Sequence, residues 1–85
     1  MRVLLPSALR SYTGCAQVEG DGDTLHALFD HLERLYPGLR FRVVDERQQL
    51  RANLRIFVNG LGVRELAHRL QPQDEVAIVL ALSGG

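Results

Sequence analysis

The last two residues of the chain, Gly84 and Gly85, are the ones whose type and position best suit chemistry. They directly follow the apolar run "EVAIVLALS". Glycine has no Cβ, so a Gly-Gly tail is thin and reaches backbone conformations that are closed to other residues. An α-carboxyl group has a pKa of about 3.5, so it is ionised at neutral pH and is a poor electrophile. If another enzyme joined the Gly85 carboxylate to AMP, its acyl carbon would become reactive.

Other candidates for catalysis or metal binding are weak. His26 and His31 are five residues apart, which is not the i,i+4 spacing of a metal-binding pair, and His68 lies in a polar segment. Cys15 is the single cysteine and lies beside a predicted strand, so we expect a small buried hydrophobic residue and not a nucleophile. The acidic turn at residues 19–23 has too few oxygen ligands for a calcium loop. We expect no metal site, no bound cofactor and no enzymatic activity of the chain itself.

Composition excludes several other classes of function. The chain has 85 residues, 46% of them hydrophobic, which suits one globular domain covering residues 1–85 with residues 83–85 as a flexible tail. A net charge of zero gives no general attraction to nucleic acid or to an anionic membrane. The lone cysteine and the absence of a signal peptide fit a cytoplasmic protein. All ten basic residues are arginine, so the chain offers no lysine for linkage to itself.

A folded domain must support such a tail, and its clearest predicted element is an amphipathic helix. Its apolar residues recur at helical spacing: Leu25, Leu28, Phe29, Leu32, Leu35 and Tyr36. Asp23 or Thr24 is the predicted N-cap, and Pro37–Gly38 are expected to end the helix. Asp30 and Arg34 have the spacing of an i,i+4 ion pair.

Strand-like segments surround this helix. They are predicted at residues 2–5, 15–20, 54–58 and 75–82, with residues 39–45 as a further strand or extended segment. Asn59–Gly60 predicts a tight hairpin, residues 45–53 a loop, and residues 63–70 a helical turn or an irregular crossing. This order predicts a two-layer α+β domain whose mixed sheet carries one main helix on one face. The expected core consists of Leu28, Phe29, Leu32, Ile56, Val58, Val76, Ile78 and Leu80.

Taken together, these segments resemble the MoaD/ThiS family of ubiquitin-like sulfur carriers, which have the β-grasp fold. Early "VLLPSALRSYTG" is similar to the first strand and turn of that family, and "DTLHALFDHLERLYPGL" to its helix. "RIFVNG" and "LQPQDEVAIVLALSGG" are similar to its later strands and Gly-Gly end. Two departures stand out: Gln73 replaces a usual glycine, and Ala81–Leu82 lie where a proline is common.

The resemblance implies a chemical role for the tail. An activating enzyme of the MoeB/ThiF type would use ATP to adenylate Gly85, with Gly84, Ser83 and Leu82 recognised as the tail. A sulfur donor would convert the carboxylate to a thiocarboxylate, and a downstream synthase would use the sulfur. The extra "VVDERQQLRAN" segment is similar to the longer MoaD-like proteins, so molybdopterin, cysteine, thiamin and secondary-metabolite pathways all remain open.

Two alternatives to a sulfur carrier use the same features. A ubiquitin-like modifier would be conjugated through Gly85 to lysines of target proteins. A β-grasp interaction module would carry the two glycines without using them.

A carrier that passes between enzymes also needs a recognition surface beside its tail. Phe57 points away from Ile56 and Val58 on the predicted strand, so it would be a solvent-exposed aromatic side chain. The alternative is that the loop at residues 45–53 covers it. The expected partner-docking patch consists of Phe57, Leu61 and Leu82, with Arg55 and Arg64 at its rim.

Overall fold

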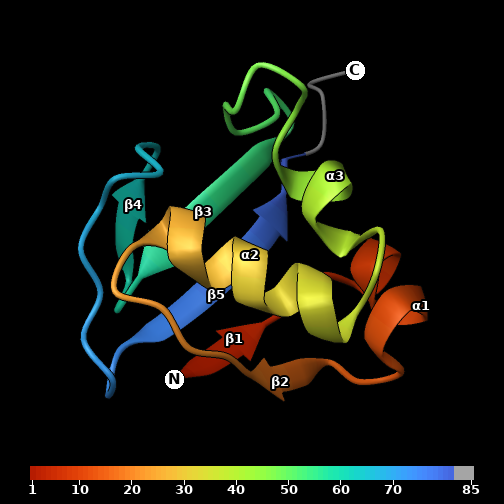
Figure 1. Ribbon diagram of the computed structural model, residues 1–85, viewed down its shortest axis with the longest axis horizontal. Coiled ribbons are helices and arrows are strands. Elements are labelled where there is room, and N and C mark those ends of the chain that lie inside the picture. The colour runs from red at the N-terminus through yellow and green to blue at the C-terminus, as the bar shows by residue number, and fades with distance from the viewer. Residues whose placement is uncertain (82–85) are drawn as a thin grey trace.

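The computed structural model describes residues 1–81 and places five strands in one mixed sheet (Figure 1). The strands are β1 (Arg2–Leu4), β2 (Gln17–Glu19), β3 (Leu54–Val58), β4 (Leu61–Val63) and β5 (Glu75–Leu80). Their order across the sheet is β2-β1-β5-β3-β4, in which β1 and β5 run parallel and the other neighbours antiparallel. The predicted mixed sheet is confirmed, and the last strand lies at its centre.

The helices are the 3-10 turn η1 (Ser7–Leu9), α1 (Arg10–Thr13), α2 (Leu25–Leu35) and α3 (Leu39–Val43). Helix α2 crosses one face of the sheet, as Figure 1 shows. Burial alternates along β3 and β5, so one face of these strands packs into the core and the other stays accessible to solvent. The predicted α+β arrangement with one main helix on one face is therefore confirmed. Among residues 1–81, no helix is long and apolar enough to cross a membrane.

The sequence of α2 explains both its ends and its orientation. The Thr24 hydroxyl accepts a hydrogen bond from the Ala27 N–H at 3.1 Å, which satisfies one of the free donors at the helix start. At the other end, the Glu33 carboxylate accepts the N–H groups of Gly38 and Arg40 at 2.9 Å each. The predicted apolar stripe faces the sheet, except that Leu35 is 50% exposed.

The predicted core is also confirmed, with one qualification. Leu80 is partly buried and packs against the edge of the core, whereas the other predicted residues are fully buried. These are Leu28, Phe29, Leu32, Ile56, Val58, Val76 and Ile78. The stripe of α2 and the inner faces of β3 and β5 therefore form one continuous apolar layer.

The segment after Pro37 differs from the sequence prediction. Residues 39–43 form α3 and not a strand, with Leu39 and Val43 buried and Phe41 58% exposed. Buried residues four apart are typical of a helix, and five residues are too few to distinguish this spacing from strand alternation. Gly38 has a φ of 96°, so it turns the chain out of α2 and into this second helix.

The fold also resolves three further expectations. Residues 63–70 form an irregular crossing, tied to the start of α2 by an isolated bridge between Thr24 and Arg69. The predicted pairing of Asp30 with Arg34 is wrong, because α3 brings Arg40 to Asp30 at 2.9 Å. The predicted hairpin at Asn59–Gly60 is confirmed, and both residues adopt the positive φ values, 51° and 86°, that such a turn requires.

Candidate functional site

The described part of the chain ends where the tail leaves the sheet. β5 ends at Leu80, which lies opposite Leu54, and the N–H of Ala81 then donates to the carbonyl of Asn53 at 2.7 Å. The predicted tail residues Leu82, Ser83, Gly84 and Gly85 lie outside the described residues. Because β5 is flanked by β1 and β3, the tail is attached to the most firmly paired strand of the sheet.

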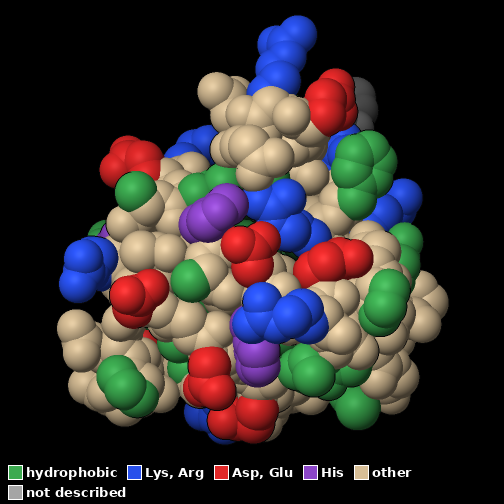
Figure 2. Space-filling model, viewed as in Figure 1, with side chains coloured by type: hydrophobic (Ala, Val, Ile, Leu, Met, Phe, Trp, Pro, Cys, Tyr) green, Lys and Arg blue, Asp and Glu red, His purple; other side chains and the backbone are tan. Residues whose placement is uncertain are grey.

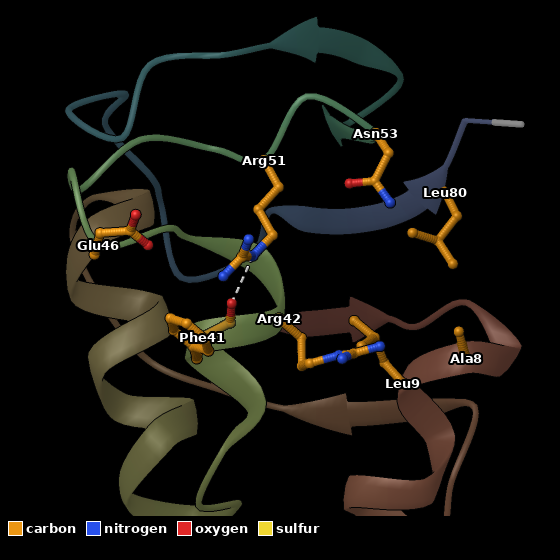
Figure 3. A pocket seen from close by; sticks show the side chains of 8 residues that line it. All are labelled: Ala8, Leu9, Phe41, Arg42, Glu46, Arg51, Asn53 and Leu80. Atoms are coloured by element: carbon orange, nitrogen blue, oxygen red, sulfur yellow. Dashed lines mark hydrogen bonds between the residues drawn. The ribbon is translucent and has the colours of Figure 1, made fainter. Parts of the chain in front are cut away.

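A polar pocket lies beside this exit on the side of α3 (Figure 3). Its volume is about 470 Å³, and it is lined by Ala8, Leu9, Phe41, Arg42, Glu46, Arg51, Asn53 and Leu80. Arg51 is held in place, since its Nε donates to the Phe41 carbonyl at 2.7 Å and its guanidinium lies 4.6 Å from the centre of the Phe41 ring. The pocket therefore presents two arginine side chains next to the last strand residue.

Phe57 lies on the face of the sheet that α2 does not cover. This side chain is half-buried and lies between Ala77 on β5 and Gly62 on β4, its opposite neighbours in the strand register. Because these neighbours are small, part of the ring remains accessible. Val79 lies opposite Arg55 on the same face and is 42% exposed. Strand alternation in β5 would have identified Val79, since Val76 and Ile78 face the core.

The structure does not bring Leu61 together with Phe57. Leu61 lies opposite Val58 in the hairpin, and directly opposed residues of two strands share a face of the sheet. Leu61 therefore points to the α2 side, at the edge of the sheet, where it is 64% exposed. The register of a two-residue hairpin could have predicted this placement.

Arg55 and Arg64, the predicted rim residues, do lie together. The Arg55 Nη1 donates to the carbonyls of Ala52 and Leu54 at 2.9 Å each. The Arg64 Nη1 donates to the same Leu54 carbonyl at 3.1 Å. Two guanidinium groups thus converge at the end of the sheet from which the tail emerges.

The histidines and the cysteine occupy structural or surface positions. The His31 Nδ1 accepts the Asp21 N–H at 3.0 Å, and the His26 Nε2 lies 3.4 Å from Asp30. The prediction that Cys15 is buried is wrong, because Cys15 is exposed in the loop before β2. Within residues 1–81, no group of three or more histidine, cysteine, aspartate or glutamate side chains could hold a metal ion.

The hydrogen-bonded carboxylates lie away from the tail and stabilise turns. Asp74 accepts the Gln71 N–H and the Asn59 side-chain amide, each at 2.8 Å, in the turn before β5. These two donors lower the pKa of Asp74 from its ordinary value of 3.8. The Gly38 and Arg40 N–H groups likewise lower the pKa of Glu33 at the end of α2. Both carboxylates therefore have a structural role in their turns.

Known proteins are similar to this chain along nearly its whole length. The family model described as the ThiS family matches residues 3–85. The sulfur carrier protein CysO of Mycobacterium tuberculosis is 36% identical over 89 aligned residues, which cover 98% of this chain and 96% of that protein. A chain of the Amycolatopsis orientalis BexX/CysO complex is 31% identical with a TM-score of 0.91, covering 99% of this chain and 98% of that chain. SAMP1 from Haloferax volcanii is 28% identical with a TM-score of 0.78, covering 100% of this chain and 98% of that chain.

Proposed function

The chain belongs to the ThiS family of sulfur carriers and has their ubiquitin-like β-grasp fold, and from this premise we propose that it carries sulfur on the carboxylate of Gly85. The observation that supports this site most directly is the central position of β5. The strand that leads to the glycines is paired on both sides, and its last described residue is bonded to Asn53. A rigid body with a thin terminal segment can present a carboxylate inside another enzyme.

The proposed chemistry has two steps. A Gly85 carboxylate oxygen attacks the α-phosphorus of ATP, so that an acyl-adenylate forms and pyrophosphate leaves. Hydrosulfide supplied by a sulfur donor then attacks the acyl carbon, the bond from that carbon to the AMP oxygen breaks, and loss of a proton leaves the thiocarboxylate. In this scheme the chain is a protein substrate and not a catalyst, and ATP is bound by the activating enzyme. We expect the reaction to take place in the cytoplasm, where ATP is available.

The proposed partners follow from these steps. A MoeB/ThiF-type enzyme would perform the adenylation, a sulfur donor would supply the sulfur, and a downstream synthase would receive it. Support for a protein partner comes from the similar chain in the Amycolatopsis orientalis BexX/CysO complex. The similarity to SAMP1, at 28% identity, keeps conjugation to other proteins as a second candidate function.

Intact mass of the chain purified from its native host tests the proposal. We expect a fraction of the molecules to have the mass of one sulfur in place of one oxygen, and fragmentation should locate the change at Gly85. Treatment with an alkylating reagent should modify this C-terminal sulfur as well as Cys15, and a Cys15→Ser variant should keep the C-terminal product. Gly85 found in amide linkage to other proteins, with no thiocarboxylate, would favour the modifier instead.

A further inference from the structure

Two arginine side chains of neighbouring segments share one hydrogen-bond acceptor at the tail end of the sheet. Arg55 and Arg64 both donate through Nη1 to the carbonyl oxygen of Leu54, at 2.9 and 3.1 Å. A carbonyl is neutral, so it orients the two guanidinium groups without compensating their charge. Like charges placed opposite each other on a sheet are destabilising, and an anion bound between them would relieve that repulsion.

A second pair of arginines lies on the other side of the same strand end. Arg42 and Arg51 line the pocket beside Leu80, and a backbone carbonyl again fixes Arg51 (Figure 3). Glu46 lines this pocket too, but it lies within ion-pair distance of neither arginine. We call Arg42, Arg51, Arg55 and Arg64 the arginine ring.

The arginine ring differs from the other paired arginines of the molecule. Arg2 binds Glu75 at 2.7 Å and Arg40 binds Asp30 at 2.9 Å, whereas no ring arginine has a carboxylate within 4.0 Å among residues 1–81. Three of the four ring side chains are nevertheless held by backbone carbonyls. Their conformational freedom is already restricted, so a ligand that binds them loses less entropy on binding.

At the opposite end of the strands, carboxylates are paired with cations, since the N-terminal amine lies 3.7 Å from Glu19 and Arg2 lies 2.7 Å from Glu75. Glu19 and Glu75 lie opposite Arg2 on the neighbouring strands, and Asp74 directly precedes β5. Figure 2 shows acidic and basic side chains interspersed over the face that carries α2. Glu19 and Glu75 are thus matched by cations, whereas the arginine ring has no carboxylate partner among residues 1–81.

We propose that the arginine ring binds aspartate and glutamate side chains on the protein that receives the tail. This inference rests on the proposed function. It adds the chemistry by which the carrier would contact the partner around the entrance to the partner's active site. Guanidinium groups match carboxylates in a two-pronged geometry, and complementary charge accelerates and orients docking. The ring occupies both sides of the strand end at Leu80 and Leu54, so it can contact carboxylates on either side of the partner's entrance.

Kinetics with the cognate MoeB/ThiF-type enzyme test this inference. Arg55→Gln/Arg64→Gln should raise the KM for the carrier in ATP–pyrophosphate exchange by at least about tenfold and leave kcat at saturation unchanged, because docking and not chemistry is affected. Added salt should weaken the wild-type interaction more than that of the variant. Arg34→Gln/Arg69→Gln is the matched control, since both side chains are exposed and lie outside the ring. Equal KM values for the ring variant and the control would overturn the inference while the proposed function stands.

A second measurement does not depend on the enzyme. NMR titration of the full chain with a ten-residue glutamate peptide should shift the Nε–H signals of Arg51, Arg55 and Arg64 saturably, with no saturable shift at Arg34 or Arg69. The shifts at Arg55 and Arg64 should be lost in the double variant. Tighter binding of inorganic phosphate or of a single-stranded oligonucleotide at the same signals, or no shift with the peptide, would overturn the proposal of an acidic protein partner.

Discussion

The N–H of Ala81 donates to the carbonyl of Asn53 at 2.7 Å, one residue beyond the last pair of β5 and β3. This bond extends the pairing of the central strand to the last described residue. The proposed chemistry takes place at Gly85, and Gly84 and Gly85 have no side chain that could pack. Folding and activation should be separable.

Deletion of Gly85, or of Gly84 and Gly85 together, should leave the melting temperature unchanged and abolish ATP–pyrophosphate exchange with the activating enzyme. The reason is that the terminal carboxylate would then belong to a different residue, whereas a glycine has no side chain to remove from the core. Circular dichroism and the exchange assay measure the two properties independently. Exchange at the wild-type rate by the shortened chain would contradict the assignment of Gly85.

Leu28→Ala tests the packing of α2 on the sheet. Leu28 is completely buried, so its truncation should lower the free energy of unfolding by about 2–5 kcal/mol. Leu35→Ala on the same helix is the control, because Leu35 is 50% exposed and should cost less than about 0.5 kcal/mol. Urea denaturation of both variants measures the difference, and equal losses would mean that the helix face is assigned incorrectly.

Gly22→Ala tests the close approach of the acidic turn to α2. A Cβ on Gly22 would lie 2.4 Å from the backbone nitrogen of Leu28 and 2.8 Å from the carbonyl carbon of Ala27. Backbone atoms cannot rotate away as a side chain can, so we expect a loss of about 1–3 kcal/mol in unfolding free energy. Asp21→Ala in the same turn is exposed and should have a small effect. A Gly22→Ala variant as stable as Asp21→Ala would show that the turn can move.

The pKa of Asp74 predicts a pH dependence of stability. Hydrogen bonds from Gln71 and Asn59 lower this pKa in the folded state below its ordinary value of 3.8. The ionised form is thus favoured by folding, so its stabilisation is present above pH 3.8 and is lost as the pH falls through the folded-state pKa. In Asp74→Asn, the amide has one acceptor oxygen in place of two and no charge, so it cannot accept the Gln71 N–H and the Asn59 amide through separate oxygens. The melting temperature of the variant should be lower at neutral pH and approach that of the wild type in acid; a constant difference would refute the assignment.

Some of these features could be predicted from the sequence because local signals agreed. The helix stripe around Leu28 and the Asn59–Gly60 turn depend on residues close together in the chain, and both are confirmed. Residues 39–43 were predicted wrongly because the apolar pattern of five residues fits both the strand period of 2 and the helical period of 3.6. Gly38 was expected to end α2, but it also precedes the first residue of α3. The arginine ring was not predictable as a unit. The sharing of the Leu54 carbonyl depends on side-chain conformations across two strands, and Arg42 lies in the segment predicted as a strand.

Phe57→Ala tests whether the accessible face of the sheet takes part in docking. The Phe57 ring lies between Ala77 and Gly62, so removing it should open no cavity in the layer beneath α2. We expect a melting temperature close to that of the wild type and a weaker affinity for the activating enzyme by calorimetry, because partly exposed aromatic side chains dominate many interfaces. Leu61→Ala is the matched control: it removes a more exposed apolar side chain, but one on the α2 side of the sheet. If the enzyme binds both variants as tightly as the wild type, the docking role of Phe57 is refuted, and a large drop in melting temperature for Phe57→Ala would place the ring in the core instead.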